Sequence, residues 1–209
     1  EAAALQAQGL EVSVYGVPAY STLGWMNWAG GDPLLNTFIA YPEGELARLV
    51  IHELAHQMVY VQGDTAFNES FATAVERIGG ARWLATHASD AVRQEYATLD
   101  TRRTAFRALT RDTRKALAVV YDPAGPLAGD PAAQTAQKAV VMDNFRAAYQ
   151  RLRIGWGADS PRNAGYDAWV ARANNATFGA QGAYDDLVPG FEALFAQLCA
   201  GRSDCTDAS

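Results

Sequence analysis

The sequence predicts a mainly helical domain of the α+β class, with a small β element near its N-terminus. Apolar residues recur at spacings of three and four through most of the chain after residue 42, which indicates amphipathic helices. The segment EVSVYG (11–16) instead alternates and is rich in β-branched residues, which favours a strand. Apolar residues make up 49% of the 209 residues, enough for the core of one domain over residues 1–209.

The elements can be predicted in order along the chain. Residues 1–10 read as the last turns of a helix that ends at Gly9, and a strand follows at 11–16. A long helix from about Pro42 to Gln62 is predicted because proline favours the first helical position and acidic residues occupy the first turn. The next predicted helix starts at the N-cap Asn68 and continues to about Gly79 or beyond. Further helices are predicted at 89–120 and 131–154, and a last helix after residue 165 ends near Gly201.

Charge, hydropathy and cysteine count exclude several classes of protein. The net charge of −6 argues against nucleic acid as a partner, because phosphate binding requires a basic excess. No uninterrupted apolar run is long enough for a transmembrane helix. Two cysteines are too few for a disulfide scaffold; Cys199 and Cys205 either close a short loop or stay as free thiols, and their proximity favours the disulfide slightly.

The sequence HELAH (52–56) is an HExxH motif within the first long predicted helix. Residues at i and i+4 lie above one another on a helix, so the imidazoles of His52 and His56 can reach one metal ion. Glu53 lies about 100° further round the helix, where it can serve as a general base for a water molecule. The motif therefore predicts one zinc ion per chain, bound by the two histidines, and catalysis by Glu53.

A carboxylate on the next predicted helix is the expected third ligand. Glu69 follows His56 after twelve intervening residues, and the turn at Gly63 lets the chain reverse so that Glu69 returns over the first helix. Two histidines and one glutamate leave a coordination position open, which is typical of catalytic zinc sites. Glu76 lies two turns further on the same face and is the alternative ligand, or a partner that orients a histidine. We favour Glu69, because Glu76 would need a closer approach of the helices.

Nearly the whole chain resembles the putative aminopeptidases of Gram-negative bacteria. The similar segments include GVPAYSTLGW (16–25), DPLLNTF (32–38), the segment 45–76, GYDAW (165–169) and YDDLVPGF (184–191), while NESFA (68–72) is similar to the NExFA element of aminopeptidase N-type gluzincins. The resemblance implies a gluzincin-like zincin fold with a small N-terminal β element and a helical remainder. It also implies aminopeptidase activity, location in the cell envelope or periplasm, and a further N-terminal segment that this chain lacks.

Two tyrosines are candidates for a hydrogen-bond donor to the oxyanion that forms when a peptide bond is attacked. Tyr184 and Tyr166 both lie in segments that resemble the family, and we favour Tyr184 as the catalytic donor. The alternative is that these are core tyrosines with the hydroxyl at the surface, which is the more common situation.

Substrate contacts are predicted at two further places. The uncharged segment YSTLGW (20–25), with Tyr20 and Thr22, could form a strand edge that pairs with a peptide backbone. Asn174 and Asn175 offer amides that could hold the substrate backbone or its terminal amine. The alternatives are a buried strand and a helix cap, respectively.

Together these features predict a zinc-dependent peptidase, most simply an aminopeptidase, whose partner is a peptide substrate. A zinc endopeptidase or processing protease is the alternative within enzymes. A zinc-bearing binding protein without turnover is the alternative outside them.

Overall fold

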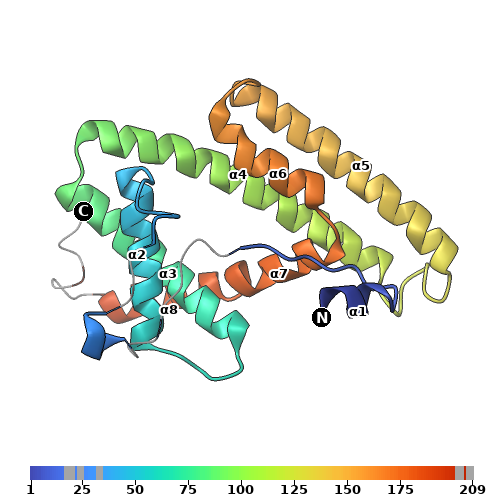
Figure 1. Cartoon of the computed structure of the whole chain (residues 1–209), viewed down its shortest axis with the longest axis horizontal. Coiled ribbons are helices and arrows are strands. Elements are labelled where there is room, and N and C mark those ends of the chain that lie inside the picture. The colour runs from blue at the N-terminus through green and yellow to red at the C-terminus, as the bar shows by residue number, and fades with distance from the viewer. Residues whose placement is uncertain (17–21, 23–25, 32–34, 201–204, 206–209) are drawn as a thin grey trace. The chain divides into compact units, whose positions relative to one another are not determined.

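A computed structural model describes residues 1–16, 22, 26–31, 35–200 and 205, and its regular elements are all helices (Figure 1). Two short 3-10 turns occur at Asn27–Ala29 and Pro161–Asn163. The α-helices are α1 (Ala2–Gln6), α2 (Glu43–Met58), α3 (Thr65–His87), α4 (Asp90–Val120), α5 (Pro131–Gly155), α6 (Ala164–Arg172), α7 (Asn175–Asp185) and α8 (Val188–Cys199).

The predicted β element is not found among the described residues, so the predicted gluzincin-like zincin fold is wrong and only its mainly helical part is confirmed. Residues 11–16 lack regular structure, and a strand is stable only when a partner satisfies its backbone groups. Here the Val12 carbonyl accepts from the side chain of Asn174, and the Glu11 carboxylate accepts from the backbone of Asn175. The beginning of α7 thus takes the place of a neighbouring strand.

The chain divides into two compact units, which we describe separately. The first unit consists of residues 1–14 and 100–181, and the second of residues 15–99 and 182–209. The core of the first unit is formed by large apolar side chains of α4, α5, α6 and α7, with edge-to-face contacts between their rings. These buried residues are Phe106, Leu117, Met142, Phe145, Tyr149, Val170, Ala173 and Phe178.

The second unit is built on the antiparallel pair α2 and α3, which lie side by side (Figure 1). Small residues allow this close packing: Ala55 of α2 and Ala72 of α3 are almost fully buried. At Gly79 an added Cβ would lie 3.0 Å from a methyl group of Ile51, so a larger residue would push the helices apart there. The two helices therefore approach closely along the faces that carry His52 and Glu69.

Helix α8 supports α3 from a second side. Phe67 and Phe71 of α3 meet the ring of Phe191 edge to face, with ring centroids 5.2 and 5.6 Å apart. Ser70 is fully buried, and its hydroxyl accepts a hydrogen bond from the backbone of Leu187 just before α8. These contacts hold the first turns of α3, where Glu69 lies.

Cys199 and Cys205 form a disulfide, which confirms the pairing favoured from the sequence. The bond brings Cys205 to α3, where its carbonyl accepts a hydrogen bond from Arg82. The guanidinium of Arg82 also lies over the ring of Phe195, 5.2 Å from its centroid. Within the described residues, the C-terminal end of α8 is thereby attached to α3.

Candidate metal centre

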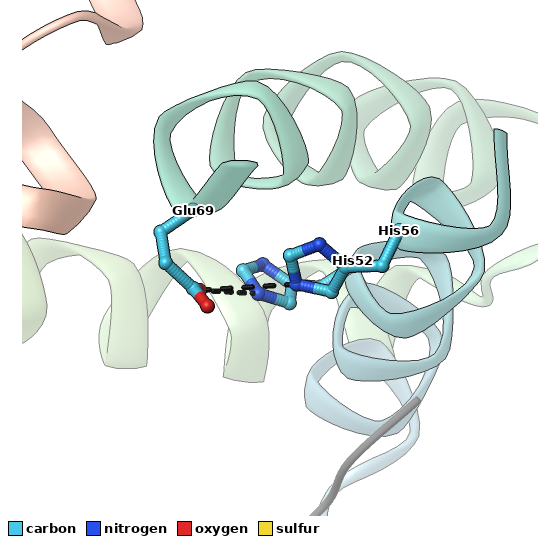
Figure 2. Close-up of side chains that lie close together, drawn as sticks. All are labelled: His52, His56 and Glu69. Carbon is cyan, nitrogen blue, oxygen red and sulfur yellow. Dashed lines mark hydrogen bonds and ion pairs between the residues drawn. The ribbon is translucent and has the colours of Figure 1, made fainter. Parts of the chain in front are cut away.

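Three side chains from α2 and α3 meet in the second unit. Their potential ligand atoms lie within 4.8 Å of one another, and the side chains belong to His52, His56 and Glu69. Figure 2 shows the Glu69 carboxylate directed at both imidazoles. Its Oε2 atom is 3.3 Å from Nε2 of His52 and 3.8 Å from Nε2 of His56. Ligands about 2.0–2.1 Å from a tetrahedral zinc are about 3.3–3.5 Å apart. The distance from Glu69 to His52 matches this spacing, and the distance from Glu69 to His56 is slightly longer.

The order of the elements explains why these residues meet. Helix α2 ends at Met58, four residues earlier than predicted, and the chain turns at Gly63, whose φ is +83°. Helix α3 begins at Thr65 with Asp64 as its N-cap, since the Asp64 side chain accepts from the backbone of Phe67. The predicted N-cap at Asn68 is therefore wrong, although the reversal that brings Glu69 back to α2 is confirmed.

His52 lies between two carboxylates. Its Nε2 atom faces Glu69, while its Nδ1 atom is 2.9 Å from Oε2 of Glu76. Burial alone would lower the pKa of His52, but the hydrogen bonds and charges of Glu69 and Glu76 raise it to about 9. Without a metal the ring is therefore protonated at neutral pH, and a metal ion would displace the Nε2 proton.

His56 is the less strongly paired imidazole. Burial lowers the pKa of His56; the charge of Glu69 opposes this and that of His52 adds to it. The two rings are nearly perpendicular, with centroids 5.0 Å apart. Among the described residues, the buried Nδ1 of His56 has no hydrogen-bond partner. The ring is thus favoured in the neutral form in which imidazole binds metals.

Glu76 is the most deeply buried acid of this cluster, and it has two partners. Its Oε2 atom bonds His52, and its Oε1 atom accepts a hydrogen bond from Nε of Arg48. Burial would raise the pKa of Glu76, but the hydrogen bond to His52 and the charge of Arg48 outweigh burial and lower it. Glu76 lies on the Nδ1 side of His52, away from the atoms that face Glu69, so the structure places it as a partner of the histidine.

The group is partly open to solvent on the carboxylate side. The side chain of Glu69 is 21% exposed, whereas those of His52 and His56 are 11% and 9% exposed. Glu53 follows His52 on α2 and is also partly exposed. Water can therefore reach the Glu69 carboxylate, whereas the two imidazoles are nearly buried.

Asn68 holds the connection between the two helices. Its side chain is 3% exposed and bonds both backbone groups of Val61: the amide donates to the carbonyl and the oxygen accepts from the N–H, each at 2.8 Å. Because Asn68 precedes Glu69 on α3, this clamp fixes the end of the loop next to the ligand. No spacing pattern indicates this clamp, because Val61 lies in the loop and Asn68 lies in the first turn of α3.

Changing Asn68 to Asp should lower the free energy of unfolding of the metal-free protein by about 1–3 kcal/mol. Aspartate keeps the shape but loses the donor to Val61 and places a negative charge against its carbonyl. Equilibrium unfolding in urea, followed by circular dichroism, measures this loss. Asn36→Asp is the control, because Asn36 is exposed in the same unit and its change should stay within about 0.5 kcal/mol. Equal stabilities of the two variants would contradict the clamp.

Other predicted site residues are placed as follows. Tyr20 lies outside the described residues, and so does the side chain of Tyr184, whose backbone belongs to α7. The hydroxyl of Thr22 accepts a hydrogen bond from the backbone of Met26. Tyr166 packs against Phe106 in the core of the first unit. The catalytic and substrate-binding roles assigned to these residues stay predictions.

Asn174 and Asn175 begin α7 in the first unit. The Asn174 oxygen accepts from the backbone and hydroxyl of Thr177, which is the pattern of a helix cap. Its amide donates to Val12, and the Asn175 backbone donates to Glu11. Both residues thus have a structural role at this helix end, and their predicted contact with substrate stays a prediction.

A family model described as Putative aminopeptidase matches residues 1–205. No curated protein and no solved structure matches the chain. Of the helices in the described part of the chain, none is both long and apolar enough to cross a membrane.

Proposed function

Because that match covers almost the whole chain, the protein belongs to the Putative aminopeptidase family, and from this premise we propose that it is a zinc-dependent peptidase. The family description indicates a peptidase. The observation that carries the zinc dependence is the convergence of His52, His56 and Glu69 on a partly open group. Two imidazoles and one carboxylate form a donor set that suits zinc and leaves room for a reactant.

The residues around the group have distinct roles in this proposal. His52, His56 and Glu69 hold the zinc ion, and a bound zinc ion supplies Lewis acidity that activates water and polarises a peptide carbonyl. Glu53 is the general base: its carboxylate takes a proton from the attacking water and passes it to the nitrogen of the leaving amine. Its position next to His52 on α2, with partial exposure, supports this assignment.

Within the peptidases, we favour an aminopeptidase, which removes residues from a free N-terminus. The support is the family description. A free α-amine is charged, so its recognition requires a carboxylate or several carbonyl and amide oxygens near the site.

A pair of matched peptides tests this function. The two peptides share one sequence, but one has a free N-terminus and the other is acetylated. We expect stepwise cleavage of the free peptide only, and loss of cleavage after treatment with a zinc chelator followed by recovery on adding zinc. Mass spectrometry of the products over time measures both outcomes.

Internal cleavage of both peptides would replace the aminopeptidase by an endopeptidase, and chelator-resistant cleavage would contradict a zinc enzyme. Zinc uptake without cleavage of any peptide in a mixed library would point to a binding protein.

A further inference from the structure

His52 makes contacts on both of its ring nitrogens, and only one of these faces the candidate ligands. The Nε2 atom is 3.3 Å from Oε2 of Glu69, whereas Nδ1 is bonded to Oε2 of Glu76 at 2.9 Å. A ring held at Nδ1 by an acceptor keeps its proton there, so the Nε2 proton is the one that a metal ion would displace. The Nδ1 contact therefore selects both the orientation and the tautomer that metal binding requires.

The acceptor is itself held in place. Oε1 of Glu76 accepts a hydrogen bond from Nε of Arg48, so both carboxylate oxygens are engaged. Arg48 lies one turn before His52 on α2 and therefore shares its face. Its side chain is 14% exposed and that of Glu76 is 6% exposed, so the pair is screened from water.

From this geometry we infer that Arg48 and Glu76 are positioning residues, which hold His52 ready for the metal and do not bind the metal themselves. The inference rests on the proposed zinc site and adds two residues to it. Arg48 fixes the Glu76 carboxylate, and Glu76 fixes the imidazole. The contacts run from Arg48 on α2 to Glu76 on α3 and back to His52 on α2. A change in the distance between the two helices would therefore move His52.

A purely structural ion pair and a positioning pair can be separated by replacing both charges. In Arg48→Met/Glu76→Leu, apolar groups of similar volume fill the buried space, and such replacements are often neutral or stabilising. A structural pair would leave zinc affinity unchanged in a variant that remains folded. A positioning pair predicts a loss of zinc affinity of about 10- to 100-fold in a metal-free variant that still unfolds in one cooperative transition.

Two further variants sharpen the comparison. Arg48→Met/Glu76→Gln restores only an acceptor for Nδ1, so it should bind zinc about 2- to 10-fold more tightly than Arg48→Met/Glu76→Leu. Arg77→Met/Glu192→Leu is the control, because it makes the same chemical change at another ion pair, 3.2 Å long, between α3 and α8. Its zinc affinity should equal that of the wild type.

The measurements use the full chain. Competition with a chromophoric chelator gives the zinc affinity of each variant, and the visible spectrum of the cobalt-loaded form reports the geometry around the metal. Wild-type affinity and spectrum in Arg48→Met/Glu76→Leu would overturn the inference while leaving the zinc site intact. An equal loss in the Arg77 control would also overturn it, because the effect would not depend on His52. A wild-type chain that takes up no zinc would instead end the proposed function and this inference with it.

Discussion

Replacing Glu53 with glutamine should lower kcat/KM for peptide hydrolysis by about 100- to 10,000-fold and leave the zinc content unchanged. The amide has nearly the same shape as the carboxylate, but it cannot accept a proton from water. Zinc should be retained because Glu53 is not one of the three side chains that meet as candidate ligands. Steady-state rates on the free peptide and zinc analysis of the same preparation measure the two quantities together.

The control for this variant is Glu43→Gln, which makes the same chemical change in the exposed first turn of the same helix. It should hydrolyse the peptide at the wild-type rate. If Glu53→Gln also kept the wild-type rate, Glu53 would not be the general base. If Glu53→Gln lost zinc, its role would be that of a ligand or of a residue needed to form the site.

Removing the third candidate ligand should affect the metal first. Glu69→Ala should weaken zinc binding by more than about 100-fold, because losing a direct ligand costs more than the 10- to 100-fold typical of an outer partner. Activity should fall with the zinc content and recover only in part at high zinc concentration. Chelator competition gives the affinity, and activity measured against free zinc shows whether the two losses follow one another.

Glu76→Ala distinguishes the two glutamates that the sequence left as alternatives. Because Oε2 of Glu76 lies at Nδ1 of His52, this change should reduce zinc affinity less than Glu69→Ala. Full zinc binding by Glu69→Ala together with loss of zinc by Glu76→Ala would reverse the ligand assignment.

The long helices could be predicted from the sequence because their signals are local. The helix Asp90–Val120 was predicted as 89–120 from apolar spacing, and Pro131–Gly155 as 131–154 from its initial proline. The predicted strand at 11–16 was wrong because alternation of side chains shows only that a segment could lie in a sheet, not that a neighbouring strand exists. The partner that a strand requires lies elsewhere in the chain, and residues 11 and 12 found theirs at the start of a helix.

The candidate site was predictable to the same extent. His52 and His56 follow from the period of one helix, and Glu69 from a reversal marked by Gly63. Arg48 and Asn68 were missed because their roles depend on which side chains of two packed helices meet, and neither is part of a spacing pattern. The position of Arg48, four residues before His52, places both on one face of the helix, but it does not show which residue of the other helix Arg48 contacts.

The pairing of α2 with α3 has a consequence for how the protein folds. Contacts of His52 with Glu69 and Glu76 close loops of only 17 and 24 residues, whereas the contact of Ser70 with Leu187 joins residues 117 apart. Since the entropy lost on closing a loop grows with its length, the helical hairpin should form ahead of its contact with α8. The candidate ligands would then come together before α8 packs against α3, and a zinc ion bound at that stage would restrict the remaining search as an early cross-link does.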